Sequence, residues 1–212
     1  MTLEEAIAKI KPLDHNAMEI AQKRWDSIAK PLHSLGKLET LLIQIAGITG
    51  NAEVDLSRRG LIAMCADNGV VEEGVTQTGQ EVTAIVAENF LKYDTSVGVM
   101  CKQNHAEIFP VDMGMVTDTK VRTDHKIAYG TQNMTKGPAM TREQAVKGLE
   151  AGIDMVRELN DKGYRILATG EMGIGNTTTS SAVASVLLKQ PVEEMTGTCA
   201  QDQCDQKSHC IK

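Results

Sequence analysis

The chain has 212 residues, of which 42% are hydrophobic and 24% are charged, which suits one large domain with room for a small helical appendage. Its net charge of −6 argues against a basic surface, and therefore against a nucleic-acid partner. No apolar run is long enough to span a membrane and no signal-peptide pattern opens the sequence, so we expect a soluble, cytoplasmic protein.

Three helices are expected before the first strand. The first follows the capping-box pattern Thr2-Leu-Glu-Glu5, in which two side chains satisfy free N–H groups of the first turn. Asp14 can cap a second helix, and Ser34 can begin a third that ends before Gly50. Because no strand separates these helices, we expect them to form a small layer of their own.

Strands and helices alternate in the rest of the chain. Short apolar runs at residues 61–66, 106–111 and 166–168 are typical of buried strands, and residues 116–140 are expected to be loop with at most one short helix. This alternation predicts an α/β fold, a three-layer parallel sheet with helices on both faces. Helical spacing places two sets of side chains inward, Val82, Ile85, Val86 and Phe90 in one helix and Ala145, Leu149, Ile153, Val156 and Leu159 in another.

An acidic residue follows each of the three apolar runs. Asp67, Asp112 and Glu171 each stand two residues before a glycine. Ligands of parallel sheets bind beyond the carboxyl ends of the strands, so this pattern predicts that the three carboxylates gather at one cleft. Each acid alone could equally serve as a turn or helix cap, an alternative that is strongest for Asp112.

The last apolar run leads into a glycine-rich loop and then a helix rich in hydroxyl groups. The predicted site residues of this loop are Gly170, Gly173, Ile174, Gly175, Asn176 and Thr177. A strand, a glycine loop and a helix N-terminus form an anion site, because free N–H groups and the helix dipole point at one place. The loop matches neither the dinucleotide fingerprint nor a P-loop. On this pattern alone, the segment could be a phosphate-binding loop or a tight turn whose hydroxyl groups only cap the helix.

The five cysteines fall into two groups. Cys65 and Cys101 lie in apolar surroundings and are expected to be reduced core residues. The others, near the end of the sequence, are Cys199, Cys204 and Cys210, with His209 among them. Their spacing matches no zinc motif and the stretch has little apolar content, so no metal site is predicted there. We expect three parts: a helical part at 1–55, an α/β domain at 56–196, and a mobile tail at 197–212.

The segment Gly170-Glu-Met-Gly-Ile-Gly-Asn-Thr-Thr178 resembles the phosphate-binding motif of the nicotinate-nucleotide:dimethylbenzimidazole phosphoribosyltransferase family of cobalamin biosynthesis. Four earlier stretches also resemble the family and occur in the family's order, at residues 24–39, 66–75, 80–83 and 130–140. The resemblance covers the chain up to about Gly197 and implies a homodimeric α/β enzyme. Such an enzyme transfers the ribosyl phosphate of nicotinate mononucleotide to dimethylbenzimidazole and needs no metal ion or redox cofactor.

The resemblance also implies roles for individual residues. The glycine loop would hold the phosphate of nicotinate mononucleotide, and Glu171 would act as the catalytic carboxylate near the ribose. Asp67, Thr76 and Gln80 would border the benzimidazole pocket. Members of the family are considerably longer, and their general base, a glutamate, lies in the part that this chain does not match. We therefore expect slow transfer at best.

Two other functions are considered for the chain. It could be a non-catalytic or fragmentary mononucleotide-binding protein that lacks the general base. A dinucleotide oxidoreductase is disfavoured, because the glycine loop comes late and leaves few residues to build a second nucleotide-binding half.

Overall fold

The computed structural model of the protein describes residues 1–196 and 207–211. The chain divides into two compact units, Met1–Arg58 and Arg59–Lys212. The first unit contains the helices α1 (Leu3–Ala8), α2 (His15–Ser27) and α3 (Lys37–Thr49), and α2 packs against α3. The capping box at Thr2 and the cap at Asp14 both form as predicted.

The start of the third helix was predicted incorrectly. Helix α3 begins at Lys37 instead of Ser34, because the preceding residues form successive turns. The Ser34 N–H donates to the carbonyl of Pro31, and the Gly36 N–H donates to the carbonyl of His33. Gly36 then takes a positive φ of 54°, a conformation that interrupts a right-handed helix and that glycine adopts at little cost.

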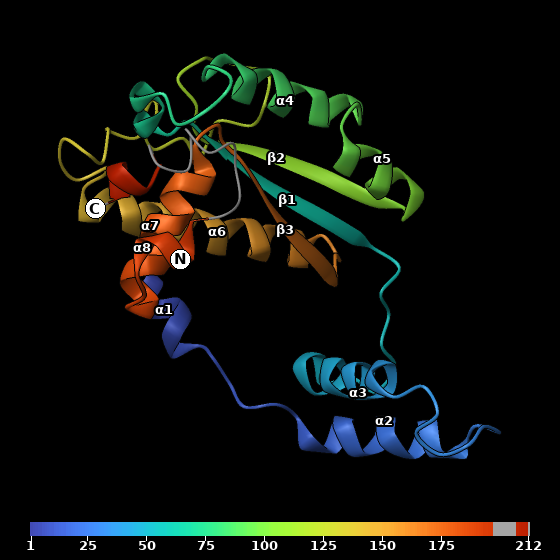
Figure 1. Cartoon of the computed structure of the whole chain (residues 1–212). Coiled ribbons are helices and arrows are strands. Elements are labelled where there is room, and N and C mark those ends of the chain that lie inside the picture. The colour runs from blue at the N-terminus through green and yellow to red at the C-terminus, as the bar shows by residue number, and fades with distance from the viewer. Residues whose placement is uncertain (197–206, 212) are drawn as a thin grey trace. The chain divides into compact units, whose positions relative to one another are not determined.

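The second unit is built on a parallel sheet in the order β2-β1-β3 (Figure 1). The strands are β1 (Arg59–Ala66), β2 (Ala106–Gly114) and β3 (Ile166–Met172). The two outer strands extend beyond the predicted runs, because pairing with β1 continues to their ends. The run at 166–168 was also predicted to be buried, but β3 lies at the edge of the sheet and Ile166 and Ala168 are exposed.

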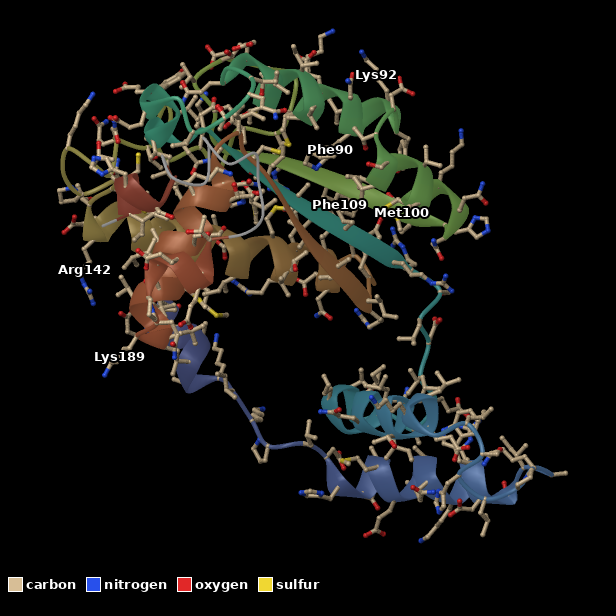
Figure 2. The ribbon with its side chains drawn as sticks, viewed as in Figure 1. Phe90, Lys92, Met100, Phe109, Arg142 and Lys189 are labelled. Atoms are coloured by element: carbon tan, nitrogen blue, oxygen red, sulfur yellow. The ribbon has the colours of Figure 1, made fainter. Side chains whose placement is uncertain are left out.

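Helices cover both faces of this sheet, as predicted. On one face, Met155 and Leu159 of α6 (Arg142–Asp161) pack with Ile62 and Val111 of the sheet. The ring of Phe109 packs on the same cluster, edge-on to Tyr164 with ring centroids 5.2 Å apart (Figure 2 labels Phe109).

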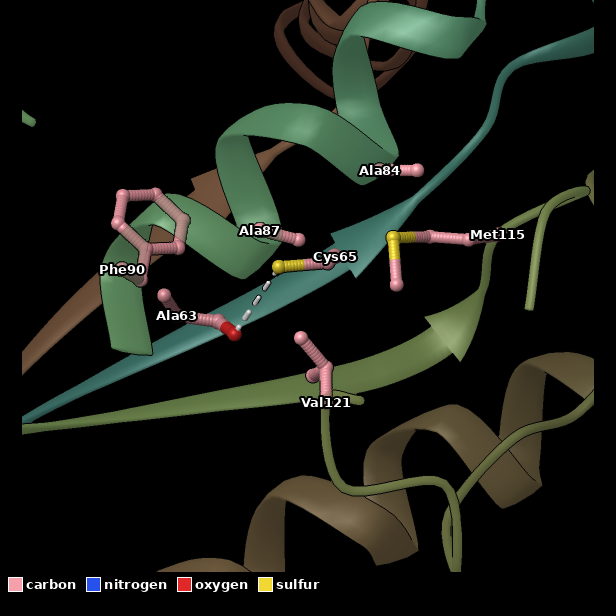
Figure 3. Close-up of a cluster of buried hydrophobic side chains, with 7 residues drawn as sticks. All are labelled: Ala63, Cys65, Ala84, Ala87, Phe90, Met115 and Val121. Atoms are coloured by element: carbon pink, nitrogen blue, oxygen red, sulfur yellow. Dashed lines mark hydrogen bonds between the residues drawn. The ribbon is translucent and has the colours of Figure 1, made fainter. Parts of the chain in front are cut away.

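The other face is covered by α4 (Glu81–Lys92). Figure 3 shows this cluster, which consists of Ala63, Cys65, Ala84, Ala87, Phe90, Met115 and Val121. Cys65 and Cys101 are buried free thiols, which confirms that prediction. Other helices of this unit are η1 (Gly69–Glu73), α5 (Ser96–Gln103), α7 (Asn176–Leu188) and α8 (Val192–Met195).

The predicted inward faces of the two covering helices are partly wrong. Ile85 of α4 is 56% exposed, and Leu149 and Val156 of α6 are exposed as well. The spacing of the large aliphatic side chains predicted the inward face of α4. In the structure, α4 instead packs on the sheet through the small side chains of Ala84 and Ala87. Small side chains allow a helix to lie close to a sheet, and a hydrophobic pattern weighted toward large residues misses such a face.

Residues 116–140 form loop and turn, as predicted, and they run along the free edge of β2. The Asp112 N–H donates to the carbonyl of Arg122 at 2.8 Å, and the Ile127 N–H donates to the carbonyl of Met113 at 3.0 Å. Further along, the Gly130 N–H donates to the carbonyl of Gly114 at 2.9 Å. The bonds to Asp112 and Met113 satisfy main-chain groups that an edge strand would otherwise leave open to solvent, whereas the Gly114 carbonyl also accepts from the N–H of Asp67 at 3.0 Å.

Candidate functional site

The three predicted carboxylates lie at the carboxyl ends of the strands, but the structure does not gather them in one cleft, because Asp67 and Asp112 are buried and Glu171 is exposed. Strand pairing places Glu171 beside Met64 and Asp112 beside Cys65, and Asp67 follows β1 directly. Burial, together with the nearby carboxylates of Asp112, Glu171 and Asp67, raises the pKa of the Cys65 thiol to about 12. The Cys65 thiol therefore stays protonated in the apolar cluster under α4.

Asp112 has a structural role, as the alternative interpretation held. It is fully buried, and its Oδ1 accepts hydrogen bonds from the N–H groups of Gly114 at 3.0 Å and Met115 at 2.8 Å. Its Oδ2 lies 3.1 Å from Nζ of Lys126. Burial opposes the charge of Lys126, but its ion pairs with Asp112 and Asp118 raise its pKa. Asp112 thus fixes the turn after β2 and anchors the edge loop.

Asp67 is also buried and organises main chain around it. Its Oδ2 accepts a hydrogen bond from the N–H of Val116 at 2.7 Å, and its own carbonyl accepts one from the N–H of Thr131 at 3.0 Å. Gln80 lies nearby in the chain, and its Nε2 donates to the carbonyl of Asn68 at 3.0 Å. Both residues therefore support the loops at the strand ends, and their placement at a benzimidazole pocket stays a prediction.

The glycine loop is held close to the ends of β1 and α4. A Cβ at Gly173 would lie 2.3 Å from the carbonyl oxygen of Ala66, so this position has no room for a side chain. Gly175 caps α7 with a φ of 88°, and no side chain caps that helix end. Glycine is needed at the first position for space and at the second for backbone conformation. The result is an uncapped helix N-terminus behind a tight loop, the geometry that suits an anion.

Two residues that sequence reasoning missed hold this loop in place. The N–H of Ile174 donates to Oγ1 of Thr83 at 3.0 Å, and Nδ2 of Asn68 donates to the carbonyl of Ile174 at 3.0 Å. Oγ1 of Thr179 also donates to Oδ1 of Asn68 at 3.2 Å. Thr83 is a buried hydroxyl on the inner face of α4, and buried polar groups need partners. A polar residue within the apolar face of α4 was therefore the sequence feature that could have predicted this contact.

Glu171 lies at the end of β3, next to the loop, and keeps exposed surface. Nδ2 of Asn176 donates a hydrogen bond to its Oε2. Partial burial raises the pKa of Glu171, and the hydrogen bond from Asn176 opposes this effect. The contact joins two predicted site residues and orients the carboxylate along the loop.

The raised pKa of Glu171 predicts a pH effect on stability. Because the folded pKa lies above the unfolded one, the contribution of this group is complete below the unfolded pKa and is lost as pH rises through the folded pKa. We expect the unfolding free energy of the native protein, relative to that of Glu171→Gln, to decline as the pH rises above the ordinary glutamate pKa of about 4. Urea denaturation of both proteins tests this, and a difference that stays constant or grows with pH would contradict it.

A pocket of about 380 Å³ lies in front of the loop. Its lining includes Thr76, the loop residues Gly173, Ile174, Gly175 and Asn176, and Lys207. Nζ of Lys207 donates to Oγ1 of Thr177 at 3.2 Å. The pocket thus brings together Thr76, most of the predicted phosphate loop and a cation that the sequence did not point to. The predicted site residues that are not among the described residues lining it are Gly170, Glu171, Thr177, Asp67 and Gln80.

Lys207 belongs to the part of the tail that was predicted to be mobile. Residues 207–211 form a short helical stretch, and only the His209 residue among them is exposed. Lys207 contacts the start of α7. The mobility of the tail stays a prediction, and residues 197–206 and 212 lie outside the described residues. Cys199 and Cys204 lie outside the described residues, so the structure does not bear on them.

A second cavity, of about 330 Å³, lies at the ends of β1 and β2 on the side of α6. Met64, Met113, Ile127 and Met140 contribute much of its lining, and no charged residue is among the described residues there. An uncharged, apolar lining does not suit a phosphate. The pocket at the glycine loop is therefore the better candidate for a nucleotide.

Within residues 1–196 and 207–211, no helix has both the length and the apolar character needed to cross a membrane. Within the same ranges, no group of three or more His, Cys, Asp or Glu side chains is arranged to hold a metal ion.

Comparison with known proteins identifies the family. The family model described as Phosphoribosyltransferase (DBI_PRT) matches residues 10–212. A nicotinate-nucleotide–dimethylbenzimidazole phosphoribosyltransferase of Ruminiclostridium cellulolyticum is 50% identical over 199 residues, which are 93% of this chain and 56% of that relative. One of Clostridium tetani is 46% identical over 197 residues, which are 92% of this chain and 54% of the relative.

A solved structure agrees with these sequence matches. The crystal structure of CobT from Thermus thermophilus is 32% identical and has a TM-score of 0.83, covering 92% of this chain and 61% of that chain. The chain spans about half the length of the curated relatives it matches. Because the family model matches almost the whole chain and the fold agrees, the chain belongs to the phosphoribosyltransferase family DBI_PRT.

Proposed function

We propose that the chain binds nicotinate mononucleotide through its phosphate at the glycine loop. We extend this to participation in the transfer of the ribosyl 5-phosphate to 5,6-dimethylbenzimidazole, which yields alpha-ribazole phosphate and nicotinate. The observation that carries the proposal is one pocket that combines the loop Gly173–Asn176, Thr76 and Lys207. The names of the relatives support this pair of substrates.

Residues of the pocket, together with Glu171 and Thr177 beside it, suit this chemistry. Loop N–H groups and the start of α7 would bind the phosphate, and Lys207 would add a positive charge beside Thr177. The bond to nicotinate breaks with positive charge developing on the ribose, and the Glu171 carboxylate beside Asn176 would stabilise that charge. Thr76, across the pocket, would border the benzimidazole. Positioning of the two substrates supplies much of the rate in such a transfer.

One observation favours a second function, mononucleotide binding with little turnover. Lys207 is the only side chain that titrates among the described residues lining the pocket, and neither a carboxylate nor an imidazole is among them. A general base contributes about 10²–10⁴-fold to a rate. A turnover assay with nicotinate mononucleotide and dimethylbenzimidazole separates the two functions. Formation of alpha-ribazole phosphate at the rate of the Ruminiclostridium cellulolyticum relative would show that a base is in place.

Lys207 gives a direct test of the phosphate assignment. We expect Lys207→Ala to weaken the binding of nicotinate mononucleotide about fivefold, because one charge-assisted contact to the phosphate is lost. Lys207→Arg should retain most of the affinity. Calorimetric titration measures both, and an unchanged affinity of Lys207→Ala would remove this residue from the site. Lys189, exposed at the end of α7, provides the control as Lys189→Ala.

Homodimeric assembly and a cytoplasmic location belong to the same proposal and rest on the resemblance to the family. Sedimentation velocity of the purified chain tests the assembly, and a monomer at all concentrations would contradict it.

A further inference from the structure

The cavity of about 330 Å³ on the α6 side of the sheet takes no part in the proposed nucleotide site. Met64 and Met113, which line it, pack on the apolar cluster under α6, whereas Met172 of the pocket at the glycine loop packs on the cluster under α4. These two helices cover opposite faces of the sheet (Figure 1). None of the described residues lines both spaces, so the cavity is separate from the pocket.

The cavity exists because the start of α6 presents small side chains to the sheet. Ala145 and Gly148 line the cavity, whereas Met155 and Leu159, further along the same helix, fill the space between helix and strands. Met64 on the central strand is consequently only half-buried. A gap of this kind forfeits dispersion contacts and leaves apolar surface within reach of water. An apolar ligand that fills the gap therefore gains both contributions.

The lining of the cavity suits an uncharged aromatic ligand. No charged residue is among the described residues there, so a charged ligand would lose hydration without gaining a counter-charge. Met64, Met113 and Met140 offer flexible thioether side chains, which adapt to flat rings. Gln144 adds an oriented polar group. Its Oε1 accepts a hydrogen bond from the N–H of Thr141 at 2.8 Å, and its Nε2 remains a donor for an acceptor on the ligand.

The volume of the cavity limits the size of the ligand. In another protein, an engineered apolar cavity of about 150 Å³ binds benzene, so the 330 Å³ found here has room for two fused rings. We propose that this cavity binds an uncharged, planar, two-ring aromatic molecule with a hydrogen-bond acceptor on its edge. The site is additional to the position proposed for benzimidazole beside Thr76, and it does not depend on the proposed function.

Methionine methyl resonances test the proposal on the native chain. Quinoline, which is uncharged at neutral pH and carries one ring nitrogen, is titrated into protein labelled at its methionine methyl groups. We expect the methyls of Met64, Met113 and Met140 to shift and to saturate with a dissociation constant below about 1 mM. The methyl of Met172, in the pocket at the glycine loop, should stay in place. N-methylquinolinium has the same rings with a positive charge and should bind at least tenfold more weakly.

A matched pair of glycine substitutions on α6 locates the site. A Cβ at Gly148 would meet Cδ1 of Ile127 at 3.5 Å, an ordinary contact, so Gly148→Leu can place its side chain in the cavity without strain. This variant should bind quinoline at least tenfold more weakly. Gly152→Leu is the control, because a Cβ there meets no described atom within 4 Å and Gly152 is not among the described residues lining the cavity. Both variants replace a helix glycine with a good helix former, so only the first should lose affinity.

Three results would overturn the proposal. The first is the absence of saturable shifts at Met64, Met113 and Met140, including a response confined to Met172, which would place the ring in the nucleotide pocket. The second is an equal effect of Gly148→Leu and Gly152→Leu. The third is a response to quinoline that weakens as the protein concentration rises, which would show that a second copy of the chain covers the cavity. No nucleotide is used, so failure here would leave the proposed nucleotide site untouched.

Discussion

Replacing Gly175 with aspartate is expected to weaken the binding of nicotinate mononucleotide about a hundredfold, which corresponds to about 2.7 kcal/mol. Gly175 caps α7 at a φ of 88° and lines the pocket. A carboxylate there would stand where the phosphate approaches the helix end and would repel it. Calorimetric titration of the variant measures the loss, and circular dichroism checks that the fold is retained.

A second substitution separates charge from backbone strain. A Cβ at position 175 would lie 2.9 Å from Cγ2 of Val71, and the positive φ is unfavourable for any side chain. Gly175→Ala shares both effects but adds no charge, so it should lose clearly less affinity than Gly175→Asp. Gly137→Asp, at a position with open space around it, should have no effect. Unchanged affinity in a folded Gly175→Asp protein would remove the loop from the site.

Replacing Asp112 with asparagine is expected to lower the free energy of unfolding by about 3 kcal/mol. The change removes the negative partner of a buried ion pair. The positive charge of Lys126, whose side chain is only 12% exposed, then lacks its buried counter-charge. Asparagine can still accept the hydrogen bonds from Gly114 and Met115, so the turn itself is not the main loss. Urea denaturation followed by circular dichroism measures the difference.

Asp118 supplies the control for this prediction. Its Oδ1 lies 3.1 Å from the same Nζ of Lys126, but its side chain is 77% exposed. Exposed ion pairs contribute about 0–1 kcal/mol, so Asp118→Asn should be nearly neutral. Equal destabilisation by the two variants would show that burial of Asp112 does not determine the strength of the pair.

The fold class could be predicted because the alternation of strands and helices is local in the sequence. The position of the three acids at one edge of the sheet could also be predicted, since the carboxyl ends of parallel strands share one edge, but a common cleft for them was not found. The roles of the individual acids could not be predicted. That of Asp112 depends on Lys126, which reaches it from a loop whose path no periodicity determines.

The residues that hold the glycine loop could not be predicted from the sequence for a similar reason. Asn68 and Thr83 hold the main chain of Ile174 from positions far away in the sequence. Their polar side chains look like ordinary turn and helix residues until the tertiary structure places them beside the loop. Lys207 lies in a stretch whose composition gave no sign of packing, and only its contact with Thr177 brings it to the pocket.

The most direct test of the account follows amide resonances of the glycine loop during titration. Nicotinate mononucleotide should shift the amides of Gly173, Ile174, Gly175 and Asn176, and inorganic phosphate should shift the same set more weakly. Nicotinate riboside, which lacks the phosphate, should leave them in place. Shifts confined to the apolar cavity near Met64 and Met113, or equal shifts with the riboside, would contradict a phosphate site at this loop.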